Sequence, residues 1–211
     1  MLVPHFSRQT FGRQQGGIPC CRLHRPNNGT EKGKSELCVR DEARRGRLSA
    51  GNRSDGAVIW ESKDGMRIEV SEAALDSVAK HISSRKRGET GGILIGCYSD
   101  DLSTAKVMLA SGPGPRAAFG SSSFTRQAFS LQAKLDREFE AGRYYLGEWH
   151  CHPGTNTAPS SQDIRQMKAI SKSADYNCPE PILMVFGKRD PSAFSTVVVV
   201  KNGGIIEFGR V

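Results

Sequence analysis

The sequence predicts an α+β domain, in which about three helices pack on the faces of a mixed sheet of about eight strands. Two observations predict this class. Short apolar segments with strand composition recur from residue 57 to the C-terminal end, and three segments with helical spacing of apolar residues lie between them. The sequence shows no internal repeat, so a repeat architecture is not expected.

The strands are expected in apolar segments bounded by turn residues. They are residues 58–62, 89–98, 105–115, 123–126, 144–152, 181–187, 195–201 and 205–209. The segments PILMVFG and STVVVVK are apolar enough to be central strands, and the Asn-Gly-Gly that follows is typical of a hairpin turn. Gly91 and Gly92 allow another backbone to approach closely. They do not form a phosphate loop, because GxxxxGK is absent.

Three helices are expected over residues 72–82, 127–142 and 160–170. Ser71 and Ser160 are suitable N-caps for the first and the third helix. Each helix carries an apolar stripe that we expect to face the core. The stripes consist of Leu75, Val78 and Ile82 in the first helix, Leu131, Leu135 and Phe139 in the second, and Ile164 and Met167 in the third.

Residues 1–55 are expected to form a basic, disordered tail, and residues 57–211 the folded domain. The tail carries 11 Lys/Arg and 5 Asp/Glu and shows no apolar periodicity, so it cannot bury enough surface to fold. The remaining residues carry 19 Lys/Arg and 17 Asp/Glu, so the charge of the domain itself does not favour a nucleic-acid partner. A true start near Val58 also stays open, although it would need a start codon other than that of methionine, because the next methionine after Met1 is Met66.

No run of about 18 apolar residues occurs, so a transmembrane helix is not expected. The N-terminal segment also lacks the apolar stretch of a secretory signal. A cytoplasmic location without membrane contact is therefore expected.

The chemistry is expected in the segment EWHCHPGTNTAPSSQD, residues 148–163. If the strand expected here forms, side chains alternate between its faces, and Glu148, His150 and His152 share one of them. Two imidazoles on one strand face can bind a single metal ion. A lone His-x-His is common without a metal, so this pair alone is a weak signal.

Asp163 follows eleven residues after His152, in the first turn of the third helix. A turn through Pro153 and Gly154 can bring its carboxylate back to the histidines. Two imidazoles and one carboxylate around zinc leave a fourth position for water, as in catalytic sites. A structural interpretation is also open, in which Ser160 and Asp163 form only a capping box.

The motif resembles the signature of the JAB/JAMM (MPN-plus) zinc metalloproteases, which have a glutamate, then His-x-His-Pro, then Ser-x-x-Asp. The matching residues are Glu89, His150, His152, Pro153, Ser160 and Asp163. The segment ETGGILIG, residues 89–96, is similar to the glutamate-bearing strand of that family. The resemblance implies the MPN fold over residues 57–211.

The resemblance also implies roles for individual residues. His150, His152 and Asp163 would bind Zn²⁺, Glu89 would be the general base, and Ser160 would stabilise the oxyanion. From the residues alone, Glu148 is an alternative base, because it lies on the face of the histidines, or a group that supports the site.

Cys151 lies between the two histidines and could be taken for a nucleophile. The alternation of side chains along the strand directs it away from the metal together with Trp149. In the family this position is usually Ser or Thr. A buried core cysteine is therefore the expected role.

The resemblance implies hydrolysis of isopeptide or peptide bonds after the C-terminus of a ubiquitin-like protein. YYLGEWHxHP in a compact domain is most similar to bacterial JAB proteins of mobile elements and of CBASS anti-phage operons. Their implied substrate is a conjugated cGAS-like nucleotidyltransferase, and their functional partner is an E1/E2-like enzyme. The alternatives are a JAMM peptidase that processes a sulfur-carrier protein, a RadC-like DNA-associated accessory protein, and a metal-free MPN scaffold.

Overall fold

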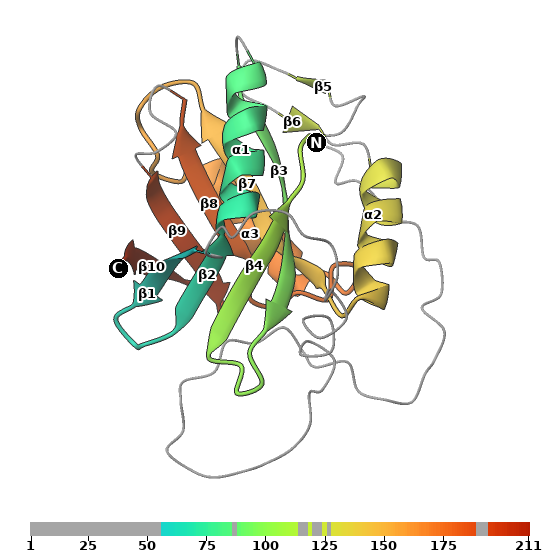
Figure 1. The fold of residues 1–211 in the computed structure, drawn as a ribbon. Helices are drawn as coiled ribbons and strands as arrows, with labels where there is room; N and C mark the ends of the chain where they lie inside the picture. The colour runs from blue at the N-terminus through green and yellow to red at the C-terminus, as the bar shows by residue number, and fades with distance from the viewer. Residues whose placement is uncertain (1–55, 86–87, 114–117, 120–123, 126–127, 189–193) are drawn as a thin grey trace.

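The computed structural model describes residues 56–85, 88–113, 118–119, 124–125, 128–188 and 194–211. These residues form a closed β-barrel with helices on its outside (Figure 1). The basic segment 1–55, expected as a tail, lies outside the described residues. Within the part of the chain that is described, no helix is long and apolar enough to cross a membrane.

The elements follow one another as strands with three interspersed helices. They are β1 (Ala57–Ser62), β2 (Arg67–Ser71), α1 (Glu72–Ser84), β3 (Thr90–Tyr98), β4 (Thr104–Ala110), β5 (Ala118–Phe119), β6 (Phe124–Thr125), α2 (Ala128–Glu140), β7 (Tyr144–His152), α3 (Ser161–Lys172), β8 (Ile182–Gly187), β9 (Phe194–Lys201) and β10 (Gly204–Arg210). The predicted content of about eight main strands and three helices is confirmed at this level.

The barrel has the strand order β1-β10-β9-β8-β7-β3-β4-β2, and β1 pairs with β2 to close it. Neighbouring strands are antiparallel except for β2–β4 and β7–β8, which are parallel. A mixed sheet is thus present as predicted, but it is closed. Closure depends on which strands pair at the two ends of the sheet, and the apolar pattern of a single strand does not specify this.

Two strand assignments need correction. The strand β2 was not predicted, although its Ile68 and Val70 are buried and alternate with polar residues. The segment predicted as a strand at 123–126 contributes only β6, which pairs with β5 in a separate two-stranded sheet. The eighth strand of the barrel is therefore β2.

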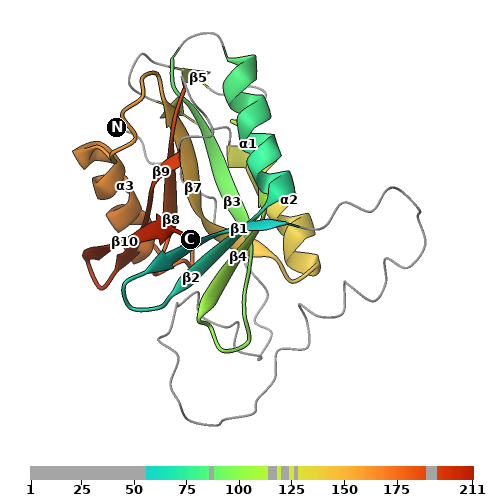
Figure 2. The same ribbon diagram turned by 60° about the vertical axis from the view of Figure 1, so that its left-hand side comes forward.

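The helices cover the barrel from two sides. α1 and α2 lie on one side and α3 lies on the opposite side (Figure 2). Val78 and Ile82 of α1 are buried as predicted, Leu75 is only partly buried against the core, and Ala74, which was not predicted, is buried as well. In α3, Met167 and Ile170 are buried in the core.

The prediction that Phe139 of α2 lies in the core is wrong, because this residue is 42% exposed, whereas Leu135 packs against the core. A helix turns about 100° per residue, so a stripe with a spacing of four residues rotates by about 40° at each step. The last member of the stripe has therefore turned away from the barrel.

Candidate functional site

The strand β7 presents its two faces as the alternation predicts. Trp149 and Cys151 are almost completely buried on one face, while His150 and His152 are half-buried on the other. β7 pairs with β3 along one edge and with β8 along the other. The two histidines therefore lie on a strand that is fixed from both sides.

Trp149 anchors β7 in the core, because its indole Nε1 donates to the Ser111 carbonyl at 2.8 Å. Its ring meets Phe186 edge to face, with centroids 6.0 Å apart. The contact requires a glycine in β3, since a Cβ at Gly92 would overlap the Ser111 carbonyl and the indole nitrogen. A Cβ at Gly91 would similarly press on the backbone of β7. The close approach predicted for the glycine pair is confirmed.

The N-terminus of α3 brings Asp163 to the histidines. Ser160 is the N-cap of α3, and its Oγ accepts from the Asp163 amide at 3.2 Å. In return the Asp163 Oδ2 accepts from the Ser160 amide at 2.6 Å. The predicted capping box is therefore present. The loop before it is held by the Lys188 amide, which donates to the carbonyls of His152 and Gly154.

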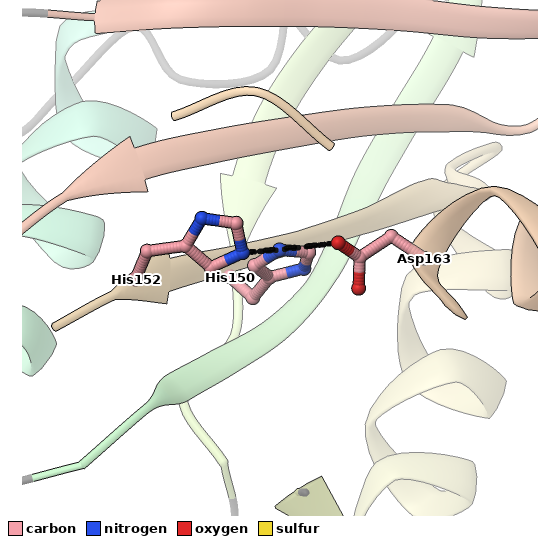
Figure 3. A group of neighbouring side chains, drawn as sticks. All are labelled: His150, His152 and Asp163. Atoms are coloured by element: carbon pink, nitrogen blue, oxygen red, sulfur yellow. Dashed lines mark hydrogen bonds and ion pairs between the residues drawn. The ribbon is translucent and has the colours of Figure 1, made fainter. Parts of the chain in front are cut away.

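The nitrogen and oxygen atoms of three side chains converge on one point (Figure 3). The Nε2 atoms of His150 and His152 are 3.1 Å apart. The Asp163 Oδ2 lies 3.5 Å from the first and 3.7 Å from the second. Among the described residues these three side chains form the group that could hold a metal ion.

The distances fit a tetrahedral zinc site. Zinc lies about 2.0–2.1 Å from its nitrogen and oxygen ligands, so two ligands at tetrahedral positions are about 3.3–3.4 Å apart. The three measured separations, 3.1, 3.5 and 3.7 Å, are close to this value. Two imidazoles and one carboxylate are also the donor set expected of a zinc site with an open position.

The tautomer of His152 is set by the loop. Its Nδ1 lies 2.9 Å from the Asn156 carbonyl, which can only accept, so Nδ1 carries the proton. The lone pair of Nε2 then points toward Asp163 and His150. The contact uses a backbone oxygen, so no side-chain signal in the sequence could have revealed it.

The charges of the site are mutually adjusted. When His152 is doubly protonated, its Nε2 can donate to Asp163, and this hydrogen bond raises the pKa of His152 against the opposing effect of burial; the Asn156 carbonyl adds to the rise. Burial acts to raise the pKa of Asp163, but the bonds with His152 and Ser160 and the charge of His150 outweigh it, so this pKa lies well below its usual range. The site therefore presents an ionised carboxylate to the two imidazoles, as a cation would require.

Glu89 lies beside the three ligands without being one of them. It precedes β3, and continuing the register of Thr90 opposite Cys151 places it opposite His152. Burial raises the pKa of Glu89, with His152 acting to lower it and Asp163 to raise it. The structure thus brings the predicted base next to the ligands, and its catalytic role stays a prediction.

Two residues with alternative roles in the sequence, Glu148 and Cys151, are buried and are not among the three candidate ligands. Glu148 is only 3% exposed and accepts a hydrogen bond from Gln166 of α3 at 2.8 Å, so it lies beneath the helix. Cys151 is a buried free cysteine, and burial raises the pKa of its thiol to about 11. The prediction of a core cysteine is confirmed. Ser160 is confirmed as an N-cap, and its role at an oxyanion stays a prediction.

Sequence reasoning missed Gln166. That Gln166 shares a helix face with Asp163 could have been predicted, because the two residues are three positions apart. That Gln166 bonds to Glu148 could not have been predicted, because the approach of α3 to β7 depends on tertiary packing.

Comparisons with known proteins agree with this geometry. The family model described as prokaryotic homologues of the JAB domain matches residues 71–200. Over 137 residues the chain is 34% identical to a CD-NTase/cGAS isopeptidase of Enterobacter hormaechei subsp. hoffmannii (strain UCI 50), with 65% of this chain and 76% of the relative aligned. It is 29% identical over 122 residues to a probable metalloprotease of Sinorhizobium fredii (strain NBRC 101917 / NGR234), covering 56% and 74%.

A solved structure shows the same fold at low identity. It is the solution structure of protein DSY2949 from Desulfitobacterium hafniense, with a TM-score of 0.51 and 18% identity. The likeness covers 66% of this chain and 88% of that chain. At this identity it bears on the fold alone.

Proposed function

This chain belongs to the family of prokaryotic homologues of the JAB domain and is a JAB-type peptidase, and from that premise we propose that it is a zinc-dependent isopeptidase of the JAMM type. Its proposed substrate is a CD-NTase, a cGAS-like nucleotidyltransferase, joined through its C-terminus to another molecule. The observation that carries the proposal is the convergence of His150, His152 and Asp163 on one point with separations suited to zinc.

When bound, zinc would supply Lewis acidity, which acidifies water and polarises the scissile carbonyl. The chain supplies the proton transfer. Glu89 lies opposite His152, and burial raises the pKa of its carboxyl group toward the working pH of a general base. It would accept the proton of the attacking water and return it to the leaving amine.

Ser160 is placed to serve two purposes. Its Oγ accepts from the Asp163 amide, and its hydroxyl also bonds to the Asp163 carboxylate, from which it could turn to a substrate oxygen. Ser160 is exposed beside the ligands, so a developing oxyanion could reach it. The same hydroxyl would thus cap α3 and stabilise the transition state.

The proposed substrate class is supported by the relative from Enterobacter hormaechei, whose name is CD-NTase/cGAS isopeptidase. An E1/E2-like enzyme that forms the conjugate is the proposed functional partner, and anti-phage defence the proposed setting. A gene for such an enzyme beside a nucleotidyltransferase gene would support this. A sulfur-carrier gene in that place would favour the processing of a sulfur carrier instead.

The experiment combines metal analysis with conjugate cleavage. The purified protein should hold about one zinc per chain, and His150→Ala, His152→Ala and Asp163→Asn should each lose it, because the other two ligands cannot replace the missing bond. A CD-NTase linked by an amide at its C-terminus should be cleaved by the zinc form and spared after chelation. Full zinc occupancy in the three variants would contradict the metal site, and an intact conjugate with zinc bound would contradict the substrate.

A further inference from the structure

Glu148 is a buried carboxyl group whose hydrogen bonds connect two elements of the site. It lies two residues before His150 on β7, and only 3% of the residue is exposed. Its Oε2 accepts from the Gln166 Nε2 at 2.8 Å, and its Oε1 accepts from the Tyr145 hydroxyl at 3.4 Å. A buried polar group without hydrogen bonds would cost free energy, so this carboxyl group ties α3 to β7.

A β-bulge in β7 makes this arrangement possible. Leu94 of β3 lies opposite Gly147, and the next residue of β3 lies opposite Tyr145, so Leu146 is an additional residue in β7. In a regular strand Tyr145 and Glu148 would lie on opposite faces, and the extra residue brings them to the same side. Gly147 has φ 152°, and a Cβ there would overlap the backbone of Ile182. The bulge therefore depends on this glycine.

The hydrogen bond between Glu148 and Gln166 lies next to the contact of Asp163 with the two histidines, and both contacts join β7 to α3. Glu148 and His150 are two residues apart on β7, about 6.6–6.8 Å along the strand. Asp163 and Gln166 are three residues apart on α3, about 4.5 Å along the helix and on the same helix face. Asp163 faces the histidines, and Gln166 meets Glu148 beside them. Two neighbouring contacts thus join the same strand to the same helix.

We propose that Glu148 and Gln166 are positioning residues for the metal site. Their hydrogen bond fixes how closely α3 approaches β7, and it thereby holds Asp163 against His150 and His152. The proposal rests on the proposed function, because the ion in question is the zinc proposed above. Groups that support metal ligands in this way typically change metal affinity or activity by about 10–100-fold when they are removed.

The test measures zinc affinity by competition with a chromophoric chelator, without substrate. Gln166→Ala should lower the affinity about tenfold or more, whereas Gln162→Ala should leave it unchanged. Gln162 is the matched control because it is an exposed glutamine one turn earlier on the same helix. Both changes are at exposed helix positions, where alanine is well tolerated, and thermal melting checks the fold.

A charge exchange separates positioning from general damage. Gln166→Glu sets two carboxyl groups against each other and should weaken zinc binding more than Gln166→Ala. When Glu148→Gln is added, the amide at position 148 can donate to the carboxylate at position 166, so the hydrogen bond is restored in the opposite direction. The double variant should therefore regain most of the zinc affinity. The visible spectrum of the cobalt-loaded protein should change in the single variant and return in the double variant, because it reports the arrangement of the ligands.

The proposal is wrong if Gln166→Ala binds zinc like Gln162→Ala, or if Glu148→Gln fails to rescue Gln166→Glu. These measurements do not depend on cleavage. If the wild-type protein binds zinc and leaves every conjugate intact, the proposed substrate fails while the positioning roles stand. If the wild-type protein binds no zinc, both proposals fail.

Discussion

At the scale of single residues, the alternation along one strand predicted the site well. The period of two put His150 and His152 on one face and Trp149 and Cys151 on the other, and the structure agrees. The position of Tyr145 could not be predicted in this way. The bulge that brings Tyr145 to the same side of β7 as Glu148 arises from the register between β7 and β3. The sequence of β7 alone does not predict this register.

The role of Glu89 is tested by Glu89→Gln, which keeps the shape of the side chain but removes its ability to accept a proton. Since Glu89 is not among the three ligands, the variant should retain its fold and its zinc. General acid–base assistance is typically worth about 10²–10⁴-fold, so turnover of a conjugate should fall by at least this order. The measurement is single-turnover cleavage by the zinc-loaded protein.

Glu148→Gln is the control for this measurement, because its amide oxygen can still accept from Gln166. Its effect on turnover should be much smaller. Normal cleavage by Glu89→Gln, together with an inactive Glu148→Gln that still holds zinc, would contradict the assignment of the base.

At the scale of elements, the sequence located all three helices but missed β2. The last residue of β2, Ser71, is also the N-cap of α1, so no turn residue marks the end of this strand. The parallel partner of β2 is β4, which lies far away in the sequence. However, β2 also pairs with the adjacent β1 across a turn that contains Asp64 and Gly65, so a local hairpin signal was present in the sequence and was missed.

The two capped helices provide a matched test of Ser160. Ser71 is the N-cap of α1 and Ser160 the N-cap of α3, and each hydroxyl accepts from a backbone amide at 3.2 Å. Ser71→Ala and Ser160→Ala should each cost about 1 kcal/mol of unfolding free energy. Only Ser160→Ala should also lower kcat, because only this serine adjoins the metal ligands.

Denaturant unfolding and steady-state kinetics on both variants check this prediction. Ser71 also donates to the Met108 carbonyl at 3.0 Å, so its variant is expected to lose slightly more stability. Equal kcat values for the two variants would confine Ser160 to helix capping.

The turn between β3 and β4 predicts a pH dependence of stability. Hydrogen bonds from Ser99 and Ser103 lower the pKa of Asp101. A carboxyl group with a lowered pKa in the folded state stabilises the protein above its unfolded pKa of about 3.9, and this contribution is lost as the pH falls through the folded pKa. Because Asp101 is exposed and solvent screens its contacts, Asp101→Ala should destabilise the protein by less than about 1 kcal/mol at pH 7.

The free energy of unfolding of the wild type exceeds that of Asp101→Ala at pH 7, and this difference should become smaller as the pH is lowered toward 3. A difference that stays constant over this range would show that the ionised carboxylate is not what stabilises the turn.

At the scale of the whole molecule, the sequence predicted seven of the eight barrel strands but not the closure of the sheet. The barrel closes because β1 pairs with β10 on one side and with β2 on the other. Both contacts join strands whose order in the sheet depends on all the others. The alternation of apolar and polar residues along one strand predicts which of its faces is buried, but it does not predict which strands are its neighbours in the sheet.

Residues 56–211 should fold on their own. All eight strands of the barrel lie within this range, and Trp60 of β1 pairs with Arg210 of β10. A protein that starts at Gly56 should melt at the temperature of the full chain and bind one zinc. Thermal unfolding and metal analysis of both proteins test this, and aggregation of the shorter one would disprove the domain boundary.

The pairing of β7 along both edges has a consequence for how the ion enters and leaves. Opening β7 requires the barrel to come apart, which costs a free energy near that of global unfolding, whereas α3 is attached through one face and can detach locally. Metal exchange should therefore proceed by a swing of α3 about the loop Pro153–Ser160, which takes Asp163 away while both histidines stay in place. In hydrogen exchange the amides of α3 should be protected by added zinc, and those of β7 should be slow with or without it.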